Sequence, residues 1–353
     1  MPKLTGETIY DIGRRLLGAA GALEGHASTV AKHLTDANLA GHDSHGFIRI
    51  PQYVEEIREG KLDPRAQPQI VSESVGTAQI NGNGTFGQVV ATRAAQIAMK
   101  KARECGISLV TICNLTHTGR IGTYLEMVAG EGMAGIMFSG GVGAWRRHVA
   151  PFGGSKGKLG TNPISMAFPQ STGAPLLLDF ATAMAAEGKI RVARSKGEML
   201  PDTWILDKDG VPSNDPEDLY EGGAMLPVGG LQGGHKGYAL STMVAAFGGI
   251  LGELGCTDTR DGSKVTGSSI IVIDIGALAP IDGVQERVEN MVKYLKDTPP
   301  MSGSSGVFYP GEIEARNRQE RQMTGVHIPQ QTWDQVSRLI DEYGLRKELD
   351  PLV

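Results

Sequence analysis

Cysteine is scarce in this sequence, and its spacing excludes several classes of protein. Only three of the 353 residues are cysteines, Cys105, Cys113 and Cys256, and they form neither a CxxC pair nor a Cys/His cluster. This scatter argues against disulfides and structural zinc, and it fits a reducing compartment. We therefore expect a cytoplasmic protein without a metal site.

Long apolar runs and an extended basic stripe are also missing. No apolar run approaches the roughly 20 residues of a membrane-spanning helix. Residues 1–3 lead into an amphipathic pattern rather than a signal peptide. The net charge is −5 at pH 7, and no basic stripe stands out. Nucleic acid and membranes are therefore poor candidate partners.

Glycine, by contrast, is abundant. The 49 glycines are close to twice the usual share of about 7%, and they cluster at 141–160, 222–237 and 302–306. Such clusters indicate tight turns, or backbone that approaches a ligand closely. The hydrophobic content of 40% and charged content of 21% are ordinary for a globular protein. A chain of this length can bury a large core and hold two interleaved domains.

Helical and extended patterns alternate along the chain, which is typical of an α/β protein. We expect a helical N-terminal region at 1–68, an α/β core at 69–310 that could hold two subdomains, and a helical C-terminal segment at 311–353. Within 70–140 the order is βαβαβ. Beyond the helices of 4–61, the predicted helices are 89–104, 121–131, 183–194, 238–254, 284–296 and 329–343, and the predicted strands are 75–80, 107–112, 134–139, 164–168, 176–180 and 269–274.

Residues 82–87, Gly-Asn-Gly-Thr-Phe-Gly, match the GxGxxG pattern of dinucleotide-binding folds. They follow a predicted strand and open a predicted helix, which is the context that this fingerprint requires. The next strand should then end near an acidic residue for the ribose, but it ends at Cys113-Asn114. Asn-Gly-Asn-Gly is also ordinary turn chemistry. The sequence therefore favours a turn over a classical Rossmann site.

The segment from His42 to Tyr53 concentrates reactive side chains. Ser44, His45 and Arg49 fall within six positions. If one helix starts here, His45, Arg49 and Tyr53 lie at i, i+4 and i+8 and share one face. Proline is tolerated only in the first turn of a helix, so Pro51 restricts where this helix can begin.

A guanidinium and an imidazole on one face suit a small 2-oxo or 2-hydroxy acid. The Arg49 fork would hold the carboxylate, and the His45 imidazole would reach the neighbouring carbonyl oxygen. The alternative is structural. Asp43 or Ser44 then caps a helix, His45 is a partly buried polar residue, and Arg49 pairs with a surface glutamate.

Three later loops carry further candidates. His117 follows a predicted strand, where α/β proteins place ligand contacts, but it is equally well a surface histidine. Thr161 lies in a turn that could hydrogen-bond a carboxamide. Residues 233–237 precede a predicted helix and could bind phosphate at its N-terminus, or form a flexible loop. Pro310-Gly311-Glu312 is a weaker signal of the same kind.

Taken together, these motifs resemble the malate/L-lactate dehydrogenase type-2 family over about residues 5–345. That family also includes sulfolactate and ureidoglycolate dehydrogenases and piperideine/pyrroline-2-carboxylate reductases. In chain order the motifs are DSHG at 43–46 with Arg49 behind it, HTG at 117–119, APFGG at 150–154, GTNP at 160–163, DFAT at 179–182, Gly188-Lys189, HKG at 235–237 and PGE at 310–312.

The resemblance implies a non-Rossmann NAD(P)-binding α/β fold of the L-sulfolactate dehydrogenase-like type, with an N-terminal helical region and a mixed sheet. It also implies a homodimer that transfers a hydride between nicotinamide and a small 2-hydroxy or 2-oxo acid. His45 would donate the proton, Ser44 would orient His45, and Arg49 would bind the substrate carboxylate. His117 would touch the cofactor and in some members the substrate. The residues implied at the NAD or NADP site are Thr118, Gly119, Arg120, Thr161, Asp179, Phe180, Ala181, His235, Lys236, Pro310 and Gly311.

Two departures from the family bear on the substrate. Imine reductases of the family carry Asp where this chain has Lys189, which favours the hydroxy-acid dehydrogenases over cyclic imine reductases. The basic run 145–148, with Arg146 and Arg147, suggests a substrate with a second anionic group, such as malate. The alternative is that these arginines pair with surface acids. The expected substrate-binding residues are Arg49, Tyr53 and Arg147. The candidates for a 2′-phosphate contact are Arg120, Arg191 and Arg194. A Ser44–His45 hydrolase is disfavoured, because adjacent helical residues diverge and no GxSxG is present.

Overall fold

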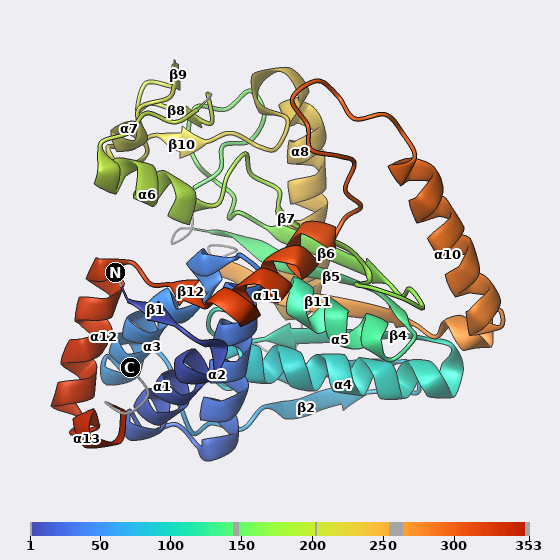
Figure 1. Ribbon diagram of the computed structural model, residues 1–353, viewed down its shortest axis with the longest axis horizontal. Coiled ribbons are helices and arrows are strands. Elements are labelled where there is room, and N and C mark those ends of the chain that lie inside the picture. Colours follow the sequence, from blue (N-terminus) through green and yellow to red (C-terminus); the bar gives the residue numbers. More distant parts are fainter. Residues whose placement is uncertain (1, 144–147, 202, 254–263, 350–353) are drawn as a thin grey trace.

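The protein is described from a computed structural model, which covers residues 2–143, 148–201, 203–253 and 264–349 (Figure 1). A seven-stranded sheet lies at its centre. The order of the strands is β2 (Gln69–Glu73), β3 (Thr77–Asn81), β4 (Ile107–Cys113), β11 (Lys264–Ile273), β5 (Ala134–Gly143), β6 (Pro163–Phe168) and β7 (Leu176–Ala181).

The sheet is mixed, and this confirms the predicted α/β class. Strands β3 and β4 pair in parallel, whereas the other strand pairs of this sheet are antiparallel. The predicted βαβαβ order is present, but β11 inserts between β4 and β5 and runs against both. Edge strand β2 was not predicted, because its five residues are all exposed and carry no apolar alternation.

Helices cover both faces of the sheet. Helices α4 (Gly87–Cys105) and α5 (Gly122–Gly130) pack on one face, where Met137 of β5 joins their apolar cluster. The next residue of β5, Phe138, stacks on Phe247 on the other face. That face is covered by one continuous helical segment, which consists of α8 (Gly230–Val244), the π-helix η3 (Ala245–Ile250) and α9 (Leu251–Glu253).

Both ends of the chain share one core beside the sheet. Its N-terminal elements are β1 (Lys3–Leu4), α1 (Gly6–Ala19), α2 (Glu24–Leu39) and α3 (Ile50–Arg58), and its C-terminal elements are β12 (Val326–His327), α12 (Gln330–Glu342) and α13 (Arg346–Leu349). Strands β1 and β12 pair, and apolar residues of both groups form one buried cluster. The predicted three-part division of the chain stays a prediction.

A smaller lobe lies on the other side of the sheet from this core (Figure 1). Its elements are α6 (Glu187–Lys196), β8 (Ile205–Leu206), β9 (Pro212–Ser213), α7 (Pro216–Tyr220) and β10 (Ala224–Met225). A single turn, η4 (Ile275–Ala277), leads to the outlying helix α10 (Ile281–Lys296), and α11 (Glu312–Thr324) then runs back across the molecule.

Close backbone contacts explain part of the glycine content. A Cβ atom on Gly267 of β11 would lie 2.8 Å from the Gly248 oxygen and 2.9 Å from the Ile112 oxygen. Gly252 faces the same strands at 3.1 Å. Small residues at these positions therefore let the helical segment of α8, η3 and α9 approach the sheet backbone directly.

Two expectations need correction. Helix α8 begins at Gly230, eight residues before the predicted start. Gly237, one of the glycines that suggested a loop, is a packing position inside the helix, because a Cβ there would lie 2.1 Å from the Val228 oxygen. Cys113 is disulfide-bonded, so the expectation of unpaired cysteines is wrong for this residue, although Cys105 is free. The spacing of cysteines in the sequence did not reveal this bond. Within the described ranges, no helix combines the length and apolarity needed to cross a bilayer.

We predict opposite effects for two glycine-to-alanine substitutions. Gly267→Ala should lower the free energy of unfolding by about 1–3 kcal/mol, because its Cβ meets backbone that cannot yield. Gly283→Ala on α10 has nothing within 4 Å and should raise it by about 0.4–1 kcal/mol. Urea denaturation of both variants measures this, and equal effects would contradict the packing role of Gly267.

Candidate active site

The segment from His42 to Tyr53 is not one helix. Two 3₁₀ turns, η1 (Asp43–His45) and η2 (Phe47–Arg49), precede α3, and Gly46 lies between them with φ −99° and ψ −144°. The predicted common face of His45, Arg49 and Tyr53 is therefore wrong. The condition set by Pro51 is met, since this residue occupies the first turn of α3.

Asn38 and Arg321 hold this segment in place. The Asn38 side chain accepts a hydrogen bond from the Phe47 N–H at 2.7 Å and donates one to Asp43 at 2.6 Å. Arg321 of α11 makes a bidentate pair with the Asp43 carboxylate at 2.6 and 3.1 Å. Asp43 thus anchors α11, and neither it nor Ser44 caps a helix.

His45 is a half-buried imidazole at the centre of this arrangement. Its Nδ1 lies 3.0 Å from the Ser44 hydroxyl, and its ring stacks on His117 with 5.4 Å between centroids. Burial, followed by the charge of Arg49, lowers the pKa of His45 to about 3. The ring is therefore neutral at pH 7, and it can exchange a proton with a bound group.

Arg49 faces a cavity. Its Nε donates to the backbone carbonyl oxygen of Ser44 at 2.7 Å, and its Nη1 donates to Gln52 Oε1 at 2.6 Å. Both partners are neutral oxygens, so the surface ion pair considered above is not the arrangement observed. The cavity, of about 710 Å³, is lined by Ser44, Arg49, Gly188 and Arg191 together with residues of α3 and α12. Burial lowers the pKa of Arg49, and the side chain remains a cation available to an anion.

His117 lies beside His45 rather than on the surface. Its Nδ1 is 2.8 Å from the Tyr53 hydroxyl, which also accepts a hydrogen bond from Gln88 at 2.7 Å. Tyr53 was predicted to bind substrate, but its side chain is fully buried and its hydroxyl supports His117. The structure thus brings Ser44, His45, Arg49 and His117 together.

Arg120 and Asp179, both predicted at the cofactor site, pair with each other in the interior. Arg120 binds Glu126 through two hydrogen bonds of 3.1 and 3.2 Å, and its Nε is 3.4 Å from Asp179. Burial raises the pKa of Asp179 despite Arg120. Burial opposes ionisation of Glu126 too, but Arg120 and Arg318 outweigh it and lower that pKa. These partners leave Arg120 no free face for a 2′-phosphate.

Sequence reasoning missed His33, which supports the loop of His117. His33 Nε2 accepts the Arg120 N–H at 2.9 Å, and its ring stacks on Tyr124. Gly119 has φ +73°, and a Cβ there would lie 2.2 Å from His33 Nε2. The position of His33 between Val30 and Leu34, on the buried face of α2, was the available signal.

Several other predicted cofactor residues lie at one end of the strands, where β4 and β7 end and β6 begins. Thr118 Oγ1 is 3.5 Å from Ser139 Oγ on β5. From there Asn162 accepts the Gly141 N–H and donates to Ser241 of α8. A polar path thus runs from the His117 loop to α8. Thr161, Phe180 and Ala181 border this path and are half-buried or exposed.

Two segments that were predicted to be cofactor-binding loops differ in structure from the prediction. His235 and Lys236 are exposed in the second turn of α8, not at its start. The Pro310 oxygen accepts the Leu177 N–H of β7, and Gly311, with φ +97°, immediately precedes α11. This loop is therefore fixed to the edge of the sheet.

The residues proposed to select the substrate are only partly described. Arg147 lies outside the described residues. Lys189 is exposed on α6, whereas Gly188 lies so close to Ser44 that a Cβ would approach its Cβ to 3.1 Å. Arg191 pairs with Glu187 and Arg194 with Glu217. Within the described ranges, no three His, Cys, Asp or Glu side chains cluster as metal ligands would.

The fold and site together define a class of protein. A half-buried neutral imidazole lies near a guanidinium that faces a cavity, beside a mixed α/β sheet. These are the groups that acid–base chemistry on a small carboxylate requires.

The chain belongs to the malate/L-lactate dehydrogenase family, whose model matches residues 5–337, and it is an oxidoreductase. It is 33% identical to a malate dehydrogenase of Pyrococcus abyssi over 96% of this chain and 94% of that one. It is also 33% identical to an L-sulfolactate dehydrogenase of Methanothermobacter thermautotrophicus, over 99% of this chain and 100% of the relative. The resemblance drawn from the motifs is thereby confirmed.

Solved structures agree. The malate dehydrogenase of Entamoeba histolytica superposes with a TM-score of 0.91 at 28% identity, over 97% of this chain and 98% of that one. The Δ1-piperideine-2-carboxylate reductase of Pseudomonas syringae pv. tomato gives 0.82 at 27% identity, over 96% and 100%. The reductase is thus similar in fold but less so than the dehydrogenase.

We predict a pH dependence of stability from His33. Burial lowers its pKa from 6.5 to about 3 in the folded protein. Between these values the unfolded chain binds a proton that the folded protein does not, so the free energy of unfolding falls as pH decreases. His33→Gln keeps an acceptor for Arg120 and should reduce this slope by about 1.4 kcal/mol per pH unit between pH 6 and 4.

Urea denaturation at a series of pH values measures the slope. The same substitution at exposed His327 serves as the control and should leave the slope as in the wild type. An unchanged slope in His33→Gln would contradict a buried, neutral imidazole.

Proposed function

We propose that the protein is an NAD(P)-dependent dehydrogenase of small 2-hydroxy acids. It transfers a hydride between nicotinamide and C2 of a 2-oxo acid, with malate, lactate or a similar compound as the hydroxy acid. The observation that carries the proposal is that Ser44 joins His45 to Arg49 at a cavity: the Ser44 hydroxyl lies 3.0 Å from His45 Nδ1, the Ser44 backbone oxygen accepts from Arg49, and Ser44 and Arg49 line the cavity. Relatives named malate, lactate and sulfolactate dehydrogenases support the substrate class.

Arg49 binds the substrate carboxylate. The hydrogen bonds from its Nε and Nη1 to Ser44 and Gln52 fix the plane of the guanidinium. A planar fork that is held in this way pairs with a carboxylate at little further cost in side-chain entropy. The carboxylate in turn places the adjacent C2 near the imidazoles.

His45 moves the proton. Reduction of a carbonyl adds a hydride to carbon and a proton to oxygen, and His45 supplies that proton and recovers it in the reverse direction. Ser44 fixes the ring through Nδ1. The charge of Arg49 is the second cause of the low pKa of His45. A bound carboxylate neutralises that charge, so substrate binding raises the pKa of His45 toward the range where it can carry a proton.

The sheet edge suits a nicotinamide cofactor, which supplies or accepts the hydride when bound. Helix α8 starts with Gly229 and Gly230 at positive φ and has no side-chain cap. The Gly230 N–H donates to the Pro227 oxygen, so the N–H groups of Leu231 and Gln232 are those proposed to meet phosphate oxygens, with Lys236 exposed nearby. Thr161 and the end of β7 offer polar and apolar contacts along the same edge. We propose that NAD or NADP binds here in a fold distinct from the Rossmann type.

A cyclic imine reductase is the second candidate, because a piperideine-carboxylate reductase shares the fold at a TM-score of 0.82. The two candidates differ in their electrophile. Oxidation of NADH and NADPH, followed by absorbance, should be fast with oxaloacetate, pyruvate or sulfopyruvate and negligible with Δ1-piperideine-2-carboxylate. Turnover of the imine alone would identify the protein as the imine reductase and refute the dehydrogenase. No turnover with either class of substrate would refute the proposal.

His45→Ala should lower kcat about 10²–10⁴-fold with the best 2-oxo acid, since the proton donor is lost. Fluorescence titration should find cofactor binding unchanged. Normal turnover would exclude His45 as the proton donor. Glu104→Ala, at the exposed end of α4, is the matched control and should keep full activity.

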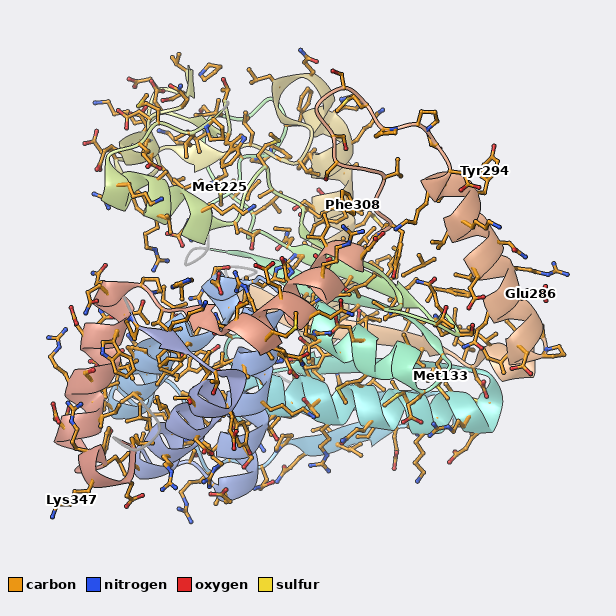
Figure 2. The ribbon with its side chains drawn as sticks, in the orientation of Figure 1. Met133, Met225, Glu286, Tyr294, Phe308 and Lys347 are labelled. Carbon is orange, nitrogen blue, oxygen red and sulfur yellow. The ribbon has the colours of Figure 1, made fainter. Side chains whose placement is uncertain are left out.

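We further propose a homodimer that uses α10. Its side chains Met291, Tyr294 and Leu295 are 46%, 79% and 45% exposed. Their i, i+3, i+4 spacing makes one apolar face, which is typical of a protein contact. Figure 2 shows α10 with Tyr294 at the margin of the molecule.

Sedimentation equilibrium tests whether α10 forms the dimer interface. The wild type should be a dimer and the double variant Met291→Glu, Tyr294→Glu a monomer, because two charges cannot be buried there unpaired. Glu286→Lys, an exposed change on the same helix, should stay dimeric. A wild-type monomer, or a dimer in all three proteins, would refute this use of α10.

A further inference from the structure

The glycine motif at 82–87 still lacks a role, and its contacts point to the catalytic loop. A Cβ on Gly87 would lie 2.5 Å from the backbone oxygens of both Thr116 and His117. A Cβ on Gly82 would lie 2.7 Å from the Asn114 oxygen. These glycines therefore seat the first turn of α4 directly against the loop that carries His117.

The residue after the motif, Gln88, reaches the same histidine through Tyr53. Gln88 and Tyr53 are both fully buried. Gln88 Nε2 donates to the Tyr53 oxygen at 2.7 Å, and the Tyr53 hydroxyl lies 2.8 Å from His117 Nδ1. The three side chains form one hydrogen-bonded chain that ends at the ring stacked on His45.

The amide of Gln88 sets the direction of this chain. Its Oε1 is buried without a hydrogen-bond partner. If the amide were turned over, two N–H donors would occupy that unpaired position, and an orphaned donor is more costly than an under-used carbonyl oxygen. Nε2 therefore faces Tyr53. The phenol oxygen accepts from Gln88, and its proton is directed to His117 Nδ1.

We propose that Gln88 is a positioning residue that fixes the tautomer of His117. With Nδ1 as the acceptor, the ring proton of neutral His117 resides on Nε2. His117 then presents a neutral N–H donor to the oxygen of a bound substrate or cofactor. Protonation of Nδ1 would turn a donor toward the Tyr53 hydroxyl and break the chain, so His45 exchanges the proton while His117 stays neutral. This division of labour rests on the proposed dehydrogenase function, whereas the tautomer does not.

The tautomer can be read without turnover. In ligand-free protein with ¹⁵N-labelled histidine, two-bond ¹H–¹⁵N correlation spectra distinguish the two ring nitrogens of each histidine. His117→Gln identifies the signal by its loss. We expect wild-type His117 to carry its proton on Nε2, with an unprotonated Nδ1. A wild-type ring protonated on Nδ1 would overturn the proposal whether or not any variant folds.

Substitution tests the role of the amide. Gln88→Met has a similar length and removes the donor, so the Tyr53 oxygen can accept from His117 in place of Gln88 and the Nδ1-protonated tautomer should appear. Tyr53→Phe should have the same effect. Gln96→Met, exposed on the same helix, should keep the wild-type spectrum. An unchanged tautomer in Gln88→Met would overturn the proposal.

Kinetics provide a separate reading. With the best 2-oxo acid, Gln88→Met should lower kcat about tenfold and leave KM within twofold, because Arg49 and the cavity are untouched. A higher KM with an unchanged kcat would mark Gln88 as a residue that shapes the pocket only, and it would overturn the proposal. If the substrate panel fails but the spectra behave as expected, the dehydrogenase proposal falls and the role of Gln88 stands.

Discussion

Three glycines hold the loops of the candidate active site against supports that leave no room for a Cβ atom. Gly46 lies against Asn38, Gly87 against the backbone of His117, and Gly119 against the His33 ring, at Cβ distances of 2.2 to 2.5 Å. Each contact fixes one loop of the candidate site on one helix, α2 or α4. The positions of His45 and His117 therefore depend on backbone packing before any side chain makes a hydrogen bond.

Ionic contacts then join distant parts of the chain around these loops. Helix α11 is the common partner, since Arg318 pairs with Glu126 of α5 and Arg321 with Asp43. Glu126 and Arg120 continue this network inward to Asp179. Buried charges of this kind are costly unless each is paired. A C-terminal helix is thus required to complete a site whose reactive groups are near the N-terminus.

The sequence allowed much of this to be predicted, and the failures have identifiable causes. Strongly periodic elements such as α4 and α10 were predicted within a few residues, and the reactive segment at Ser44, His45 and Arg49 was found from residue types alone. Strand β2 and the first turns of α8 were missed, because an exposed edge strand carries no apolar alternation and packing glycines resemble a loop. Contacts between side chains that are distant in the sequence could not be predicted. The pairing of Arg120 with Asp179 and the support of His117 by Tyr53 and Gln88 link residues tens of positions apart, and no local pattern encodes them.

The insertion of β11 has a consequence for how the chain is made. Strands β4 and β5 each bond to β11, which is synthesised about 130 residues after β5 ends. At about 5–20 residues per second, a ribosome needs roughly 7–26 s to cover that distance. During this interval the nascent chain holds two strands with an open edge between them, a state that favours pairing with other chains. The central sheet can therefore be completed only late in translation, after β11 has been made.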